Sequence, residues 1–294
     1  MRIQRAVEEF LLACDANGRS EKTIVWYRSL LGRLALSFQT QEADAITTSE
    51  LRQYIRSLRH GHYSDDTINA HIRAAHKLFK FLAEEFGHSN PMDGIEYPKM
   101  PRRKIPKACS IADVIKLMDA CPDTPKGKRD KAIIAFLLDT GARAGGVCSL
   151  TVDGLDLERG RAIVVEKGDE LLTHFFTEET KELIQAWLMV RRPVSPYVFY
   201  SMHTGQKLNS NALTILMGSL KEKAGVTGRV NPHSFRHGFA REYILAGGDM
   251  GTLSRILGHK DITTTQNSYA IFLTDELARA HDKFSPMKLI KKQE

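Results

Sequence analysis

A basic, proline-punctuated segment divides the chain after its first hundred residues. Beyond Asn90-Pro91, residues 99–107 have the sequence KMPRRKIPK, with five basic side chains and no acidic one. Proline fixes φ and lacks a backbone donor, so such a segment neither continues a helix nor joins a sheet. The chain has 294 residues, which is enough for two domains of ordinary size. We therefore predict a domain at 1–97, a basic linker at 98–107 and a second domain at 108–294.

The first domain has the pattern of a helical unit. Apolar residues recur at the spacing of one helical face in the stretches 21–38 and 65–86, and a further helix is expected over 48–58. Ser20 and Ser64 precede the first and last of these and are suitable N-caps. No run alternates with the period of a strand, so residues 1–97 are expected to contain helices only.

The second domain mixes helices with a small sheet. Short β-like runs at 153–157, 161–166 and 171–176 follow an apolar helix expected at 131–139, and a Lys-Gly turn signal separates the last two runs. Further helices are expected at 110–120, 178–191, 209–224, 234–246, 251–257 and 274–284. The predicted fold class is mainly α with two domains, a helical N-terminal one and a mixed α/β one with a small antiparallel sheet.

Composition excludes several protein classes. No apolar run reaches the roughly 20 residues that span a bilayer, and MRIQRAVEEF carries acidic residues where a signal peptide is apolar. The four cysteines form no CxxC pair and no zinc-ligand spacing, which indicates reduced thiols. We expect a cytoplasmic protein with no membrane partner.

Positive charge is concentrated where a phosphate backbone could lie. The net charge is +7, yet residues 1–98 hold 12 basic and 13 acidic side chains, so the excess begins at the linker. A second basic group occupies one ridge of the helix at 65–86, at i, i+4 and i+7. Solvated surface positions are the alternative for both groups. The candidate DNA contacts are Arg73, Lys77, Lys80, Lys99, Arg102, Arg103 and Lys104.

Six polar residues in the second domain occur in an informative order. Each alone has an ordinary alternative, such as a salt-bridged arginine, a capping histidine or a solvated lysine. The pair His233 and His237 is a weak zinc candidate, because no carboxylate or cysteine ligand lies near it in the sequence. The candidate catalytic residues are Arg143, Lys167, His233, Arg236, His259 and Tyr269.

This set is suited to phosphoryl transfer without a metal or cofactor. Arginines bind the non-bridging oxygens of a phosphate and neutralise transition-state charge. Histidine exchanges a proton near neutral pH, and a desolvated lysine can protonate a leaving alkoxide. A tyrosine hydroxyl can attack phosphorus and store the bond as an ester.

The order of the six residues resembles that of the tyrosine recombinases, the phage-integrase and Xer-like family of site-specific DNA recombinases. The resemblance covers nearly the whole chain: INAHIRAAHKLFKFL and its surroundings resemble the family's core-binding, SAM-like domain, and TGARAGG onward resembles its catalytic domain. It implies that Tyr269 is the nucleophile, that Lys167 is the general acid and that His233 assists proton transfer. It also implies that the phosphate is held by Arg143, Arg236 and His259.

The resemblance further implies a covalent 3′-phosphotyrosyl intermediate on double-stranded DNA. It implies a tetramer on two DNA sites, formed with identical or related protomers, in which the helix at 274–284 is exchanged with a neighbour. Because the sequence starts directly with the core-binding pattern, a simple Xer-like or mobile-element recombinase is expected. The alternatives are a type IB topoisomerase and a DNA-binding relative that has lost strand transfer.

Two positions depart from the family's pattern. The family commonly has an acidic residue three positions after the first arginine, where this chain has Gly146. The orientation that such a carboxylate gives Arg143 must then come from elsewhere or be missing. In addition, TTQNSY is one residue longer than the usual TTQxY. One residue rotates a helical side chain by about 100°, so we expect a loop or irregularity within 263–268 that lets Tyr269 reach the phosphate.

Overall fold

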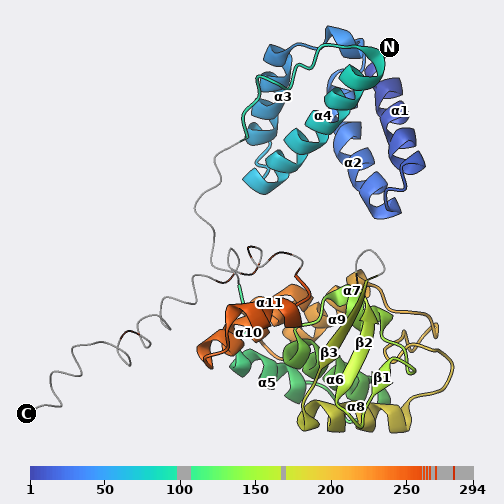
Figure 1. Ribbon diagram of the computed structural model, residues 1–294, viewed down its shortest axis with the longest axis vertical. Coiled ribbons are helices and arrows are strands. Elements are labelled where there is room, and N and C mark those ends of the chain that lie inside the picture. Colours follow the sequence, from blue (N-terminus) through green and yellow to red (C-terminus); the bar gives the residue numbers. More distant parts are fainter. Residues whose placement is uncertain are drawn as a thin grey trace, which may run out of the picture. The chain divides into compact units, whose positions relative to one another are not determined.

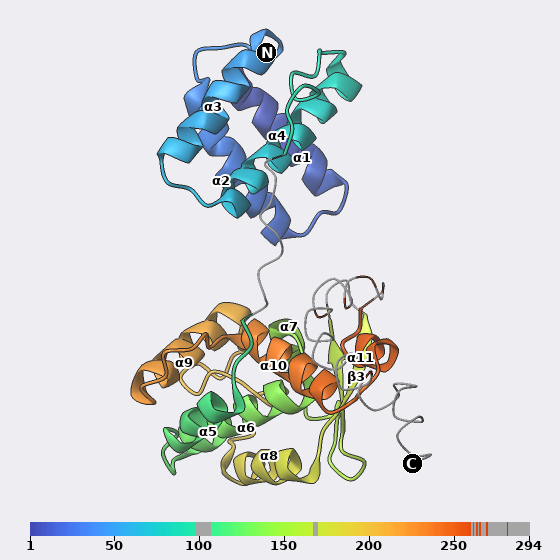
Figure 2. The same ribbon diagram turned by 90° about the vertical axis from the view of Figure 1, so that its left-hand side faces the viewer.

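The computed structural model describes residues 1–97, 107–166, 170–259, 261, 263, 265, 269 and 281. The chain forms two compact units, Met1–Lys104 and Ile105–Glu294. The first contains helices and the second adds a small antiparallel sheet (Figures 1 and 2), so the predicted fold class is confirmed. Among the described helices, none combines the length and the apolar character needed to cross a membrane.

The first unit is built from amphipathic helices that begin at side-chain caps. The Ser20 and Ser64 hydroxyls accept hydrogen bonds from the backbone N–H of Thr23 and Thr67, as their positions predict. Thr47 and Glu50 form a reciprocal capping box. The helices are α1 (Ile3–Ala16), α2 (Glu21–Ser37), α3 (Thr48–His60) and α4 (Asp65–Phe86), with a 3₁₀ turn η1 (Ala43–Ala45).

The core of this unit collects the apolar faces of all four helices. Leu31 of α2, Leu51 of α3 and Leu78 of α4 are among its fully buried members. Helix α1 was not assigned individually from the sequence; it buries Ile3 and Phe10 in the same core. Burying such side chains contributes about 1.5–3 kcal/mol each, which explains why short helices persist here.

The second unit surrounds a larger apolar core. Phe136 of α6, Trp187 of α8 and Phe235 of α10 are completely buried in it. Its helices are α5 (Ile111–Asp119), α6 (Pro125–Thr140), α7 (Ala144–Ser149), α8 (Glu178–Val190), α9 (Ser210–Lys223), α10 (Pro232–Leu245) and α11 (Met250–Ile256).

The sheet has three antiparallel strands in the order β1-β2-β3. These are β1 (Leu155–Asp156), β2 (Arg161–Val165) and β3 (Leu171–Phe175), and β2 and β3 form the predicted hairpin, with Val165 opposite Leu171. Ala162 and Val164 of β2 are buried and alternate with exposed neighbours, as expected of a sheet with one face on the core.

Two elements differ from the sequence-based expectation. Helix α6 begins six residues earlier than predicted, because Thr124 caps it and Pro125 occupies its first turn. Helix α7 is absent from the helices expected from the sequence; its six residues bury Val147 and Cys148 against the core, and this packing overrides the low helix propensity of Gly145-Gly146.

The four cysteines are free and buried. Burial raises the pKa of the Cys109 thiol to about 12 and that of Cys121 to about 11. These thiols therefore stay protonated and behave as small apolar side chains.

Candidate active site

Arg143 is positioned by the end of α6. Gly141 ends that helix with φ +61°, a left-handed conformation that glycine adopts without strain. The chain then turns into Ala142, which is fully buried, and Arg143. The Arg143 guanidinium donates to Glu166 Oε2 at 2.8 Å and to the Gly258 carbonyl at 3.4 Å. One third of the Arg143 side chain is exposed, so the guanidinium contacts the buried Glu166 on one side and is accessible to a ligand on the other.

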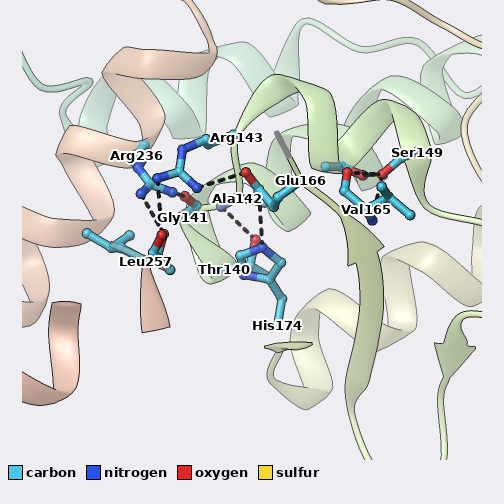
Figure 3. Close-up of polar contacts among 12 residues, drawn as sticks. Thr140, Gly141, Ala142, Arg143, Ser149, Val165, Glu166, His174, Arg236 and Leu257 are labelled. Carbon is cyan, nitrogen blue, oxygen red and sulfur yellow. Dashed lines mark hydrogen bonds and ion pairs between the residues drawn. The ribbon is translucent and has the colours of Figure 1, made fainter. Parts of the chain in front are cut away.

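Arg236 is fixed in the first turns of α10. Asn231 and Ser234 cap this helix reciprocally at 2.9 Å, and Pro232 starts it. The buried Arg236 guanidinium donates to the carbonyl oxygens of Gly141 at 2.8 Å and Leu257 at 2.7 Å. One side chain thereby joins the end of α6 to the end of α11 (Figure 3).

The two arginines lie close enough to influence each other electrostatically. Burial lowers the pKa of Arg236 to about 10, and the positive charge of Arg143 adds to this shift. Nearby Glu166 acts in the opposite direction. Arg236 remains cationic at neutral pH, and two guanidinium groups of this kind form a strong anion site.

His259 completes this cluster as a hydrogen-bond acceptor. Its Nε2 lies 2.8 Å from Arg236 Nη2 and its Nδ1 lies 2.5 Å from the Thr265 hydroxyl. Because arginine can only donate, we assign the ring proton to Nδ1. Burial lowers the pKa of His259 to about 4, with the charges of Arg236 and Arg143 contributing. The ring is therefore neutral at physiological pH.

Tyr269 is buried beside His237. The tyrosine is 2% exposed, and its ring packs with Ile244 of α10 and Leu253 of α11. Its hydroxyl lies 3.0 Å from His237 Nδ1. Burial raises the pKa of Tyr269, although a hydrogen bond with Arg236 and the charges of both arginines oppose the shift. The phenol is thus neutral and needs a base before it can attack.

Glu166 links Arg143 to the sheet. Its carboxylate is buried between the Arg143 guanidinium and His174, whose Nε2 lies 3.8 Å from Glu166 Oε1 (Figure 3). Burial alone would raise the pKa of this carboxyl, but its contacts with His174 and Arg143 and the charge of Arg143 outweigh burial and hold the pKa at about 2. Glu166 is therefore ionised at all working pH values.

The remaining candidates differ in what the structure describes of them. His233 is exposed in the first turn of α10, where partial desolvation and the charges of Arg236 and Arg143 lower its pKa. The ridge residues of α4 are exposed, and Lys80 pairs with Glu84 at 3.5 Å. The candidates outside the described residues are Lys99, Arg102, Arg103, Lys104 and Lys167, and most of 274–284 also lies outside them.

The stretch before Tyr269 is described only in part. Thr263, Thr265 and Tyr269 have helical backbone, whereas the residues between them lie outside the described ones. The expected irregularity within 263–268 therefore stays a prediction. Thr265 is fully buried where its hydroxyl contacts His259, so this threonine helps to position the histidine.

Sequence reasoning missed two members of the site. His237 was weighed only as half of a zinc pair; within the described chain, no cluster of three or more His, Cys, Asp or Glu side chains could hold a metal ion. Glu166 was not singled out, although it directly precedes Lys167. Its acidic charge next to a candidate catalytic lysine, together with the missing acid at Gly146, was the available signal.

Comparison with known proteins matches both units to one family. The phage integrase family model matches residues 110–273, and the phage integrase N-terminal SAM-like domain matches residues 7–85. Tyrosine recombinase XerA of Thermococcus kodakarensis is 30% identical over 291 residues, which cover 97% of this chain and 96% of the relative. Tyrosine recombinase XerD of Vibrio cholerae is 30% identical over 296 residues, covering 96% and 97%.

Solved structures show the same fold. The crystal structure of XerA recombinase is similar with a TM-score of 0.54 and 25% identity, covering 96% of this chain and 99% of that one. The Tn1549 transposon integrase, solved in complex with transposon right end DNA, gives a TM-score of 0.76 at 19% identity, covering 97% and 100%. The chain therefore belongs to the phage integrase family and is a tyrosine-type site-specific recombinase.

Proposed function

We propose that this protein cuts and rejoins double-stranded DNA at specific sites with Tyr269 as its nucleophile. The single observation that carries the proposal is the cluster in which Arg143, Arg236 and His259 converge beside the Tyr269 hydroxyl. Two arginines beside a tyrosine hydroxyl favour attack on a phosphodiester. An ordinary packing tyrosine would not need two cations beside its hydroxyl.

The reaction conserves the energy of the phosphodiester bond. The Tyr269 oxygen forms a bond to phosphorus while the bond from phosphorus to the 5′ oxygen breaks, which leaves a 3′-phosphotyrosyl ester. The phenolic proton passes to a base, and an acid protonates the 5′ oxygen. The 5′-hydroxyl of a partner strand then attacks the ester and releases the tyrosine, so no cofactor is required.

The proposed phosphate-binding residues differ in how many of their N–H donors are free to reach the DNA. Arg143 is partly exposed and keeps N–H groups for the non-bridging oxygens. Arg236 is more deeply buried and would supply mainly charge in a site of low dielectric, where charge acts strongly. A bound phosphate would also raise the pKa of His259 and favour the form that donates a hydrogen bond to it.

Proton transfer involves two histidines and a lysine. His237 contacts the Tyr269 hydroxyl and has a pKa lowered mainly by burial, so its neutral ring can accept the phenolic proton. His233 is exposed at the start of the same helix and stays the family-derived candidate for assisting this step. Lys167 is the proposed acid for the 5′ oxygen, on the basis of the family resemblance.

The assembly is also proposed by analogy with the family. A lambda integrase dimer and XerH recombinase have been solved bound to DNA, and each shares only the fold with this chain. We propose that four protomers act on two duplexes, with the exposed ridge of α4 and the basic segment at 99–107 along the phosphate backbone. Since DNA is the substrate, we expect the protein to act in the cytoplasm.

Covalent trapping tests the nucleophile. The purified protein is incubated with a pool of duplexes that carry a randomised core and a nick in one strand, so that cleavage releases a short fragment and prevents rejoining. Wild type should form an adduct that survives denaturation, and sequencing the trapped DNA defines the site. Tyr269→Phe keeps the ring and should form none. An adduct from the variant, or none from wild type, contradicts the proposal.

A further inference from the structure

We propose that Glu166 is a positioning residue for Arg143 and replaces the carboxylate that the family commonly carries at the position of Gly146. Gly146, in turn, leaves the space that Glu166 occupies. In this chain the acid beside Arg143 comes from the end of β2, and α7 carries a glycine in its place. This inference rests on the proposed function and adds a residue, Glu166, that is not among the six candidate catalytic residues.

The contact between Glu166 and Arg143 is built rather than incidental. Glu166 Oε2 lies 2.8 Å from Arg143 Nη1, and the glutamate side chain is 6% exposed against 33% for the arginine. The carboxylate therefore lies on the inner side of the guanidinium and leaves its outer edge accessible. A buried carboxylate that engages one edge of a guanidinium restricts its rotation, and the fork retains donors for a phosphate.

Gly146 and Glu166 compete for one volume. A Cβ at position 146 would lie 2.9 Å from Glu166 Oε1 and 3.1 Å from Val164 Cγ2. Any side chain there would therefore displace the carboxylate. The same short distance means that an aspartate at 146 would bring its own carboxylate close to where that of Glu166 now lies. An acid fits on α7 or on β2, but not on both.

Charge makes this acid necessary. Arg143 and Arg236 repel each other, which contributes to the lowered pKa of Arg236, while Glu166 counteracts that shift. Without Glu166, the repulsion between the two guanidiniums would be opposed only by the neutral groups they contact, such as the carbonyl oxygens of Gly141, Leu257 and Gly258, until a phosphate binds. An ionised Glu166 keeps Arg143 beside Arg236 beforehand, so that less reorganisation is needed during the reaction.

Glu166 also anchors the hairpin that carries the proposed acid. Its backbone N–H donates to the Glu170 carbonyl at 2.8 Å and closes the base of the turn between β2 and β3. Lys167 is the next residue in the chain. The residue that orients the clamp arginine is thus covalently adjacent to the lysine expected to protonate the leaving oxygen.

The test is a double-mutant cycle on the duplex recovered by covalent trapping. Single-turnover cleavage rates are measured for Glu166→Gln, Arg143→Ala and the double variant, with binding of the uncleaved duplex measured in parallel. Glu166→Gln should slow cleavage about 10- to 100-fold, the usual cost of removing an orienting partner, with unchanged DNA affinity. In the Arg143→Ala background the same change should cost less than about twofold, because the residues act as one unit.

A swap of the two positions tests the space argument. Glu166→Gly and Gly146→Asp should each slow cleavage, the first by loss of the acid and the second by crowding. The combined variant should cleave about tenfold faster than Glu166→Gly alone, because the carboxylate is restored from α7. A combined variant no faster than Glu166→Gly overturns the claim that Gly146 provides the space.

Other outcomes separate the inference from the proposed function. Glu166→Gln cleaving at the wild-type rate, or with an equal loss in both backgrounds, refutes the positioning role while wild-type cleavage upholds the function. If wild type forms no adduct, the proposed function fails first. Arginine side-chain NMR then still tests the orientation: the Arg143 Nε–H signal should be distinct in wild type and averaged in Glu166→Gln, and identical spectra refute it.

Discussion

Replacing Arg236 by alanine should destabilise the second unit as well as block the reaction. The guanidinium is 4% exposed and donates to two buried carbonyl oxygens, of Gly141 and Leu257, and to His259. These acceptors belong to segments far apart in the sequence. Truncation therefore leaves the ends of α6 and α11 without the donor that joins them.

The magnitude follows from those contacts. Each buried acceptor left without a donor costs about 1–3 kcal/mol, and the two carbonyls together cost about 2–6 kcal/mol on that basis. Removing a charge that burial already penalises, as the lowered pKa of Arg236 indicates, returns part of this cost. We expect a net loss of about 3 kcal/mol, equivalent to about 6–12 °C in Tm for a unit of this size.

Tryptophan fluorescence measures the effect where it occurs. The chain has two tryptophans, Trp26 in the first unit and the fully buried Trp187 in the second, so Trp26→Phe makes urea unfolding report on the second unit alone. The matched control is Arg241→Ala on the same helix, because the Arg241 side chain is 43% exposed and its ion pair among the described residues is with the neighbouring Glu242. If Arg236→Ala unfolds at the same urea concentration as Arg241→Ala, the structural role assigned to Arg236 is wrong.

Three further predictions concern neighbouring residues. His237→Ala should slow cleavage by about 100-fold if His237 takes the phenolic proton of Tyr269, and an unchanged single-turnover rate would remove it from the reaction. Folding lowers the pKa of His259 from 6.5 to about 4, so the stability that this group contributes is complete above pH 6.5 and is lost as the pH falls toward 4. The loss should be on the order of 1 kcal/mol, because the ring is half-buried. His259→Gln should therefore flatten the pH dependence of the urea midpoint. Gly141→Ala should cost about 2 kcal/mol, from positive φ and a Cβ placed 2.6 Å from Phe239 Cδ1, and an unchanged Tm would contradict the strain.

Much of the fold could be predicted because local signals agreed with tertiary packing. The helix expected at 65–86 coincides with α4, since a continuous apolar stripe and the Ser64 cap both specify it. The hairpin of β2 and β3 was likewise indicated by its turn residues. Helix α7 could not be predicted, because Gly145 and Gly146 disfavour a helix locally and the burial of Val147 and Cys148, which stabilises it, depends on the tertiary fold.

The sequence predicted which residues lie in the site, but not which contacts they make with one another. The order of polar residues predicted Arg143, Arg236, His259 and Tyr269 as site residues, and the structure places these four side chains in one cluster. Their catalytic roles stay predictions. Glu166 could not be predicted as a site residue, because its contact with Arg143 spans 23 positions in the sequence and depends on β2 lying beside α7. A single sequence does not show how close two such residues lie in space.

The burial of Tyr269 has a consequence for accuracy. A protein that searches a chromosome meets a vast excess of wrong phosphodiesters before it meets its target. With Tyr269 as the proposed nucleophile, contact with a phosphate would not be enough for attack, because the side chain packs among residues of α10 and α11 and its hydroxyl contacts His237. The tyrosine would first have to be uncovered. Substitutions that loosen the packing of Ile244 or Leu253 around it would therefore alter how often the wrong DNA is cut, even where the chemical step itself is unchanged.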